Sequence, residues 1–406
     1  MKVRKRDTTA LALGSAISGL LAYLVFALTT RVLGAEAAAP VSVLWSYWSF
    51  AGAAFTFPLQ HWIATSVTPH GEGAVRGTLA RLCLVVVVTS LLLGGLAWVG
   101  RDPLFHRDDL WFPGLVVLVT LGSALIGVVR GGLSASGRFI SVAWGFVAEN
   151  AVRCVAVGVL ILADVRSAVG YGFSLVAGYL VAVFWPASLR FGRHRTSMEE
   201  HIPFAFLTGA ALAQLLSQVV LTGGPVVLAL AGGTPAEVTA LFAALALFRA
   251  PFIVALGVVS QLTGRITRLF IAGEAASLRR IRNGIVGTTA GSALLAGLGG
   301  ALLGPALLRL IFGSAVQFPS GQAAVVAVGS VVAIGNLVVT VTVMAQNRPR
   351  AVARPWVVAV IAAGIGFVAL GGLQPTERTV WCFLIAEVAA FVTLVIEEVR
   401  KAPSPN

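Results

Sequence analysis

Twelve apolar stretches run through the chain, and most of them are 18 to 25 residues long. A helix rises about 1.5 Å per residue and must cross a hydrocarbon core of about 30 Å, so each stretch is long enough to span a bilayer. The pattern predicts an all-α polytopic membrane protein with twelve transmembrane helices. The predicted spans are 8–30, 41–66, 80–100, 112–129, 139–163, 168–189, 203–231, 237–259, 284–306, 323–345, 353–372 and 378–399.

Composition supports this interpretation, and the placement of the basic residues explains the positive formal charge of the chain. The chain is 58% hydrophobic and 11% charged, with a formal charge of +13. If both termini are cytoplasmic, 21 of the 29 lysines and arginines fall on the inner side, counting span ends with the adjoining loop. This bias is the positive-inside pattern, in which basic residues lie beside anionic lipid headgroups. We therefore expect a multi-pass protein of the inner (cytoplasmic) membrane with both termini cytoplasmic, in contact with membrane lipids and not with nucleic acid.

Signatures of enzymes are missing from the sequence. It has no G-x-x-x-x-G-K-[ST] loop for nucleotide phosphates, no H-E-x-x-H and no G-x-S-x-G, and its five histidines are scattered. The cysteines Cys83, Cys154 and Cys382 fall within predicted spans and lack metal-ligand spacing. We expect no enzyme activity, no metal and no cofactor.

Short matches about 200 residues apart indicate an internal duplication. Leu33 to Glu36 (LGAE) precedes the second span, and Ala231 to Glu237 (AGGTPAE) precedes the eighth. Leu104 and Phe105 resemble Ile311 to Gly313 (IFG). The clearest match is Leu133 to Arg138 (LSASGR) against Val343 to Arg348 (VMAQNR). Because six spans separate the copies, the halves enter the membrane from the same side and are parallel repeats.

The duplication predicts three parts in the chain. Residues 1–189 form an N-terminal lobe of six helices, residues 190–202 form a cytoplasmic linker, and residues 203–406 form a C-terminal lobe of six helices with a short cytoplasmic tail. A cavity between two such lobes is the expected place for a substrate.

The chain resembles a known family through several short motifs. These are the loop Arg31 to Gly34 after the first helix, the glycine and acidic residue before the eighth, and the pattern Gly137, Arg138, Phe139 after the fourth. They are similar to the polysaccharide (O-antigen type) flippases of the multidrug, oligosaccharidyl-lipid and polysaccharide exporter superfamily. The resemblance implies a V-shaped, MATE-like pair of lobes, alternating access, and a central cavity lined by helices 1, 2, 7 and 8.

Ionisable side chains near span centres are costly and therefore informative. Glu149 and Arg153 are four residues apart in the fifth span, which allows an intrahelical pair. Such a pair either pins helix packing or makes Glu149 a proton carrier with Arg153 as its partner. Glu387, in the twelfth span, has no charged neighbour at helical spacing and is either a proton site or a hydrogen-bonded packing residue.

Arg249 is the first candidate for substrate binding. It keeps its charge, lies halfway along the eighth span and precedes Pro251, which we expect to kink the helix. A guanidinium group binds phosphate oxygens through two parallel hydrogen bonds, so Arg249 suits a pyrophosphate. The alternative is an interhelical ion pair with Glu387 or Glu149.

Polar residues in other spans are weaker candidates. In the seventh span, Gln214, Ser217, Gln218 and Thr222 share one face, and the two glutamines can bind sugar hydroxyls or hydrogen-bond to other helices. The further candidates are Gln60 and His61 at the cavity mouth, Arg31 at the outer end of the first helix, and Trp45 and Trp48, as interfacial anchors or stacking platforms. A hydrogen-bonded histidine and a snorkelling arginine are the alternatives for His61 and Arg31.

These features predict a flippase that moves a lipid-linked (polyprenyl-pyrophosphate) saccharide across the cytoplasmic membrane. Its partners would be that substrate and the glycosyltransferases or polymerase of the same pathway. One alternative is an ion-coupled drug or cation antiporter of the same superfamily, which would need a cavity rich in acids. The other is a membrane scaffold for polysaccharide assembly that transports nothing.

Overall fold

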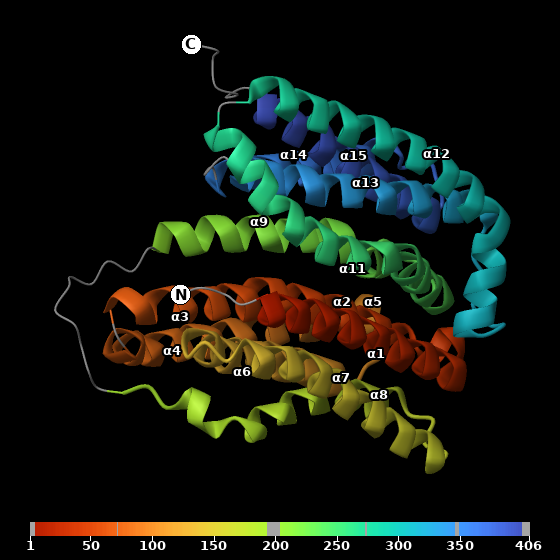
Figure 1. Cartoon of the computed structure of the whole chain (residues 1–406). Helices are drawn as coiled ribbons and strands as arrows, with labels where there is room; N and C mark the ends of the chain where they lie inside the picture. The colour runs from red at the N-terminus through yellow and green to blue at the C-terminus, as the bar shows by residue number, and fades with distance from the viewer. Residues whose placement is uncertain (1–4, 71, 193–203, 273, 346–348, 400–406) are drawn as a thin grey trace. The chain divides into compact units, whose positions relative to one another are not determined.

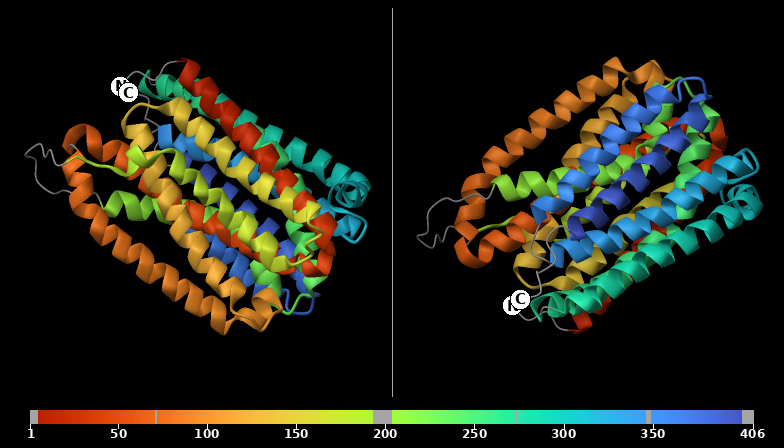
Figure 2. Two further views of the ribbon diagram at one scale, coloured as in Figure 1. Left: turned by 90° about the horizontal axis from the view of Figure 1, so that it is seen from below. Right: turned by 90° about the horizontal axis from the view of Figure 1, so that it is seen from above.

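The structure is a computed structural model that describes residues 5–70, 72–192, 204–272, 274–345 and 349–399. In these residues all regular secondary structure is helical (Figure 1). The chain divides into two compact units, residues 1–211 and 212–406, and the division falls inside helix α9. Within each unit the long helices run side by side as a bundle (Figure 2).

Unit 1 is built around helix α6, which is the most buried of its long apolar helices and packs against α2, α3, α4, α7 and α8. The helices of this unit are α1 (Lys5–Ala37), α2 (Ala39–Ala51), the π-helix η1 (Gly52–Thr56), α3 (Phe57–His70), α4 (Glu72–Val99), α5 (Arg101–Phe105), α6 (Trp111–Ala135), α7 (Phe139–Leu162), α8 (Ala168–Ala177) and the 3₁₀ segments η2 (Gly178–Phe184) and η3 (Pro186–Leu189).

Unit 2 is built around helices α13 and α15, which pack against each other and against α11. Its hydrophobic core includes Val339, Trp356 and Leu394. The helices are α9 (Phe204–Thr222), α10 (Gly224–Leu230), α11 (Pro235–Ile271), α12 (Ala275–Phe312), α13 (Ser320–Ala345), the 3₁₀ turn η4 (Pro349–Val352), α14 (Ala353–Ala369) and α15 (Pro375–Val399).

The expected polytopic membrane fold is confirmed. Among the described residues, eight helices are long and apolar enough to cross a membrane, and α9 with α10, which meet at a bend of 66°, bring the count to nine if the pair is taken as one span. The remaining predicted stretches also coincide with helical segments: 41–66 with α2, η1 and α3, 168–189 with α8, η2 and η3, and 353–372 with the shorter α14. All twelve apolar stretches are therefore helical where the structure describes them.

One predicted boundary was wrong in a way that matters for function. The fourth span was expected to end at residue 129, directly before Arg130, but α6 continues to Ala135 and buries Arg130. The apolar run ends before the helix does, because a buried ion pair replaces hydrophobic contact near the C-terminal end of α6.

Backbone conformation supports the duplication. Gly34 and Gly232, in the first pair of matched loops, have φ of 78° and 85°. In the second pair, His106 and Gly313 have φ of 51° and 104° and each follows a buried phenylalanine. Positive φ is uncommon outside glycine, so its recurrence at matched positions is informative.

Some predicted features lie outside the described residues. In the third matched pair, Gly137 also has a positive φ of 72°, but its counterpart falls in residues 346–348. Most of the predicted linker, residues 193–202 of 190–202, is likewise outside the described ranges.

Replacing Gly232 by alanine is expected to destabilise unit 2 by about 1 kcal/mol, because φ of 85° strains a residue with a Cβ even though nothing lies within 4 Å of that position. Gly95 is the matched control. It also has open space around it but lies inside α4, so Gly95→Ala should be neutral or slightly stabilising. Thermal denaturation of the purified variants measures the difference. Equal stabilities would contradict a strained turn at Gly232.

Candidate charge and substrate sites

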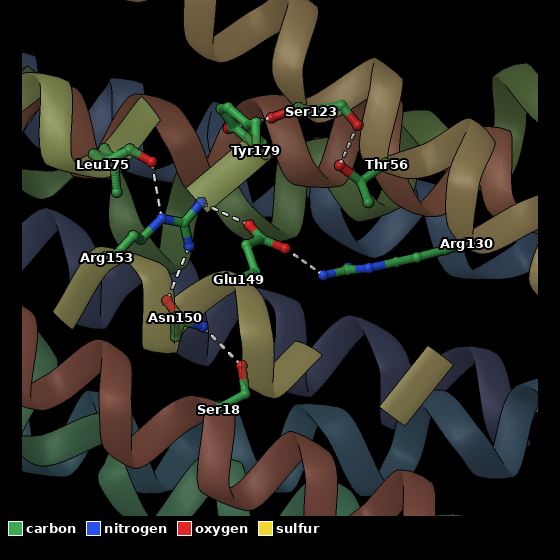
Figure 3. A network of polar contacts seen from close by, with 9 residues as sticks. All are labelled: Ser18, Thr56, Ser123, Arg130, Glu149, Asn150, Arg153, Leu175 and Tyr179. Atoms are coloured by element: carbon green, nitrogen blue, oxygen red, sulfur yellow. Dashed lines mark hydrogen bonds and ion pairs between the residues drawn. The ribbon is translucent and has the colours of Figure 1, made fainter. Parts of the chain in front are cut away.

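A buried network of three charged residues lies inside unit 1 (Figure 3). Glu149 and Arg153 come from α7, and Arg130 comes from α6. The Oε1 atom of Glu149 accepts a hydrogen bond from Nη2 of Arg153 at 2.6 Å, and Oε2 accepts one from Nη2 of Arg130 at 2.5 Å. The exposed fractions are 0% for Arg153, 3% for Glu149 and 8% for Arg130. The carboxylate is therefore bound by a guanidinium group on each side.

Arg153 connects helices α6 and α7 to two more helices. Its Nε donates to the carbonyl oxygen of Leu175 in α8 at 2.8 Å, and Nη1 donates to Oδ1 of Asn150 at 2.9 Å. Asn150 in turn donates to the Ser18 hydroxyl in α1 at 2.7 Å. All three nitrogen atoms of the guanidinium group are hydrogen-bonded, and α1, α6, α7 and α8 share one polar network.

Aromatic rings surround the two guanidinium groups. The Cζ atom of Arg153 lies 4.6 Å from the ring centroid of Trp48 and 5.5 Å from that of Tyr179. The Cζ atom of Arg130 lies 4.2 Å from the Phe146 ring centroid. The network has two positive charges and one negative charge, and the electron-rich ring faces stabilise the excess positive charge.

The geometry gives Glu149 a structural role. The expected intrahelical pair with Arg153 is present, and Arg130 forms the second pair. A proton on Glu149 would break both ion pairs and leave two buried guanidinium groups uncompensated, which is costly. The arrangement pins four helices together, so the carrier role expected for Glu149 and Arg153 stays a prediction without geometric support.

A second group of hydrogen bonds starts at Tyr179, whose ring lies near Arg153, and reaches the π-helix. The hydroxyls of Tyr179 and Ser123 are 2.9 Å apart, and Thr56 donates to the Ser123 carbonyl at 2.8 Å (Figure 3). Thr56 is the last residue of η1, which interrupts the second span. π-Helical turns frequently mark functional positions. The hydrogen bond between Thr56 and Ser123 thus connects η1 to α6.

The tryptophans of the second span contact other side chains of unit 1. Trp45 is buried and packs edge-to-face against Phe26, with ring centroids 5.9 Å apart. Trp48 lies over Arg153. The interfacial and stacking roles of the two tryptophans stay predictions.

Glu387 is the fully buried carboxyl group of unit 2. Asn336, from α13, donates from Nδ2 to Oε2 of Glu387 at 2.7 Å and to its backbone carbonyl oxygen at 3.0 Å. The other carboxyl oxygen, Oε1, and Oδ1 of Asn336 have no hydrogen-bond partner in the described part of the chain. Buried polar atoms are nearly always satisfied, so a pair of unsatisfied oxygens marks a site that can accept a proton or ligand.

Arg249 lies on α11 at the bend of the neighbouring span. Its Nη1 donates to the carbonyl oxygen of Leu221 at 3.3 Å, next to the end of α9 where the chain turns into α10. Arg249 is half-buried and also interacts electrostatically with Glu387. Helix α11 continues through Pro251, so the marked bend belongs to α9 and α10.

The hydroxyls of α9 are satisfied within their own helix. Ser217 donates to the backbone carbonyl of Gln214, and Thr222 donates to that of Gln218, both at 2.8 Å. Gln214 is exposed and Gln218 is half-buried. The amides of Gln214 and Gln218 are polar groups that the described part of α9 can offer to a ligand, close in sequence to the carbonyl that holds Arg249.

The other predicted site residues belong to unit 1. Arg31 is exposed near the kink of α1 at Gly34, while Gln60 is half-buried and His61 exposed on α3. No group of three or more His, Cys, Asp or Glu that could hold a metal is present among the described residues. Of the sequence-predicted site residues, the structure brings Glu149 and Arg153 together as an ion pair. Sequence patterns did not indicate that Arg130 is a partner of Glu149 or that Asn336 is a partner of Glu387.

No family model matches the chain, and no curated protein sequence is similar to it. Solved structures are similar in fold. They include the inward-facing conformation of a multidrug resistance MATE family transporter of the MOP superfamily (15% identity, 98% of this chain, 95% of that chain, TM-score 0.66) and an outward-facing conformation (16%, 98%, 95%, TM-score 0.60).

A third similar structure is that of a MOP superfamily transporter from Pyrococcus furiosus (15% identity, 98% of each chain, TM-score 0.60), whose description reads that the reverse polarity of its binding pocket suggests a different function. At sequence identities of 15 to 16%, the similarity establishes the fold alone. The chain is an all-helical membrane protein with the fold of the MATE transporters of the MOP superfamily.

Proposed function

We propose that the protein is an alternating-access transporter that moves a lipid-linked saccharide with a polyprenyl-pyrophosphate group across the cytoplasmic membrane. The observation that carries this proposal is Arg249, a permanent cation placed within a membrane span beside the bend of α9 and α10. A guanidinium group is suited to bind pyrophosphate oxygens in a bidentate contact of two parallel hydrogen bonds. Gln214 and Gln218, on the same bent span, are assigned to sugar hydroxyls.

The balance of charge favours an anionic substrate over a cationic drug. A cation antiporter needs acids that outnumber bases in its membrane interior. In unit 1 two buried arginines share one glutamate, and in unit 2 Glu387 is accompanied by Arg249. The reverse polarity described for the Pyrococcus furiosus transporter indicates that this fold accommodates pockets of different charge.

Deletion of the gene tests the transport direction and the substrate. We expect the lipid-linked saccharide to accumulate on the inner leaflet, because glycosyltransferases continue to make it while its exit is blocked. Wild-type protein supplied in trans should remove the accumulated material. An unchanged level of lipid-linked saccharide after deletion would rule out the flippase assignment.

Replacing Gln218 by leucine is expected to raise the substrate concentration for half-maximal transport by roughly fivefold, the loss of about one neutral hydrogen bond. Ser217→Ala is the matched control, because the Ser217 hydroxyl already donates its hydrogen to the backbone of its own helix. Transport rates in proteoliposomes at several substrate concentrations measure both variants. Equal effects of the two substitutions would remove Gln218 from the sugar site.

A further inference from the structure

The break between α9 and α10 deprives one backbone carbonyl group of its usual helical donor. In a continuous helix the carbonyl of residue 221 would accept a hydrogen bond from the N–H of residue 225. Residue 225 is a proline, which has no N–H. Helical hydrogen bonds are present on both sides of this gap, from Gly223 N–H to the Val219 carbonyl at 2.8 Å and from Val227 N–H to the Gly223 carbonyl at 3.0 Å. The missing bond therefore falls at Leu221, beside the bend.

The Leu221 carbonyl lies in a buried part of unit 2. Leu221 is 5% exposed, Thr222 is 2% exposed, and Pro225 is buried. A buried backbone carbonyl nearly always has a hydrogen-bond partner, because an unpaired one costs about as much free energy as a lost hydrogen bond. Arg249 supplies a donor here, since its Nη1 atom lies 3.3 Å from the Leu221 oxygen in a hydrogen bond. The acceptor that Pro225 leaves open is thus the one that Arg249 binds.

Packing between α10 and α11 brings Arg249 to this carbonyl. A Cβ atom added to Gly224 would lie 3.0 Å from Cδ1 of Leu245 and 3.3 Å from Cδ2 of Leu241, so the first residue of α10 approaches α11 closely because it has no side chain. Leu241, Leu245 and Arg249 follow one another at intervals of four residues and share one face of α11. Arg249 therefore lies one turn beyond the contact, on the face that the break packs against.

The bond to the carbonyl fixes the guanidinium group before a substrate arrives. An arginine side chain has several rotatable bonds, and ordering it costs conformational entropy. A group that is already ordered in the free protein loses less entropy when it binds a ligand, so its affinity is higher. The carbonyl also lies at the C-terminal end of α9, where the partial negative charge of the helix stabilises a cation.

We propose that Pro225 is a positioning residue for Arg249: by withholding an N–H it leaves the Leu221 carbonyl to hold the guanidinium group where phosphate oxygens bind. This inference rests on the proposed function and adds the residues that place its phosphate-binding group. Pro225 acts through the backbone and not by touching the substrate. Pro225→Ala supplies an N–H that competes with Arg249 for the carbonyl and allows α9 and α10 to continue as one helix.

A double-mutant cycle tests the positioning role. The measurement is titration calorimetry of the purified full-length protein with geranyl pyrophosphate, at probe concentrations up to the millimolar range. Pro225→Ala should weaken binding roughly fivefold, the effect of about one hydrogen bond, and Arg249→Ala should weaken it at least roughly tenfold. Adding Pro225→Ala to Arg249→Ala should have no further effect, because a residue that acts through Arg249 then has nothing to position. Pro305→Ala, which supplies an N–H inside α12, is the matched control and should bind as wild type.

A backbone substitution tests the carbonyl itself while Pro225 stays in place. Replacing Thr222 by the α-hydroxy acid with the same side chain turns the Leu221 amide carbonyl into an ester carbonyl, which is a weaker acceptor. Binding of the probe should weaken roughly threefold. The same replacement at Val220 weakens the Val219 carbonyl, which accepts from the Gly223 N–H, and should leave the affinity at the wild-type value. This pair of variants decides the question if Pro225→Ala does not fold.

The outcomes separate the two proposals. No binding of the probe by folded wild-type protein, or undiminished binding by Arg249→Ala, would overturn the proposed function. If Arg249→Ala weakens binding, the positioning role is overturned by wild-type affinity in Pro225→Ala, by an additive loss in the double variant, or by equal affinities of the two ester variants. Each of these three results would leave the proposed function standing.

Discussion

Replacing Glu149 by leucine should lower the free energy of unfolding by about 3 to 5 kcal/mol, the typical cost of removing one partner from a buried ion pair. Both Arg130 and Arg153 bind this carboxylate, and both are buried, so the substitution leaves two guanidinium groups without a counter-charge. Thermal denaturation of the detergent-solubilised protein measures the effect. Glu149→Gln should show a large part of it, because the amide keeps the volume and loses the charge.

The exposed pair of Asp164 and Arg166 is the control for this measurement. Their side chains are 81% and 72% exposed, so Asp164→Asn should change stability by less than about 1 kcal/mol. Wild-type stability of Glu149→Gln would contradict the structural role of the network and would reopen the carrier role of Glu149. Replacing all three charged residues by leucine or methionine should recover much of the loss, because no buried charge then remains unpaired.

Replacing Arg249 by alanine should strongly reduce transport while leaving the fold intact. Charged hydrogen bonds contribute about 1.5 to 3 kcal/mol each, so transport at low substrate concentration should fall at least roughly tenfold, up to about 150-fold. Arg249→Lys keeps the positive charge but cannot form the bidentate contact, so it should give an intermediate rate of transport. The measurement is the amount of lipid-linked saccharide on the inner leaflet of cells that carry each variant.

Arg279→Ala is the matched control for Arg249. Arg279 is an exposed arginine at the start of α12, so its removal takes away one positive charge at a different place in unit 2. It should leave the level of lipid-linked saccharide at the wild-type value. If Arg249→Ala also leaves that level unchanged, the protein acts as a scaffold for the assembly enzymes rather than as a transporter.

The fold was predictable from the sequence because the bilayer imposes a length on every apolar segment and requires its backbone to be helical. This is why all twelve stretches coincide with helical segments, including those that the chain interrupts at η1 and at Gly223. The interruptions themselves were not predictable. A π-turn at Gly52–Thr56 and a 66° bend after Thr222 depend on packing between helices, which hydropathy does not report.

The candidate site was predictable only where its contacts are local. Glu149 and Arg153 are four residues apart on one helix, and their pairing follows from helical geometry. Arg130 is 19 residues from Glu149, and Asn336 is 51 residues from Glu387, so these contacts required the tertiary structure. Arg130 was also assigned to a loop, because the hydrophobic run stops before the helix does.

The central claim is that Arg249 recognises the pyrophosphate group of a lipid-linked saccharide. Its most direct test is the movement of two matched probes across proteoliposomes that contain the purified protein: a polyprenyl-pyrophosphate saccharide and the same saccharide joined to polyprenol by an uncharged ether. Wild-type protein should move the pyrophosphate probe at least roughly tenfold faster, and Arg249→Ala should lose that preference. Equal rates for both probes with wild-type protein, or a preference that survives in Arg249→Ala, would contradict the claim.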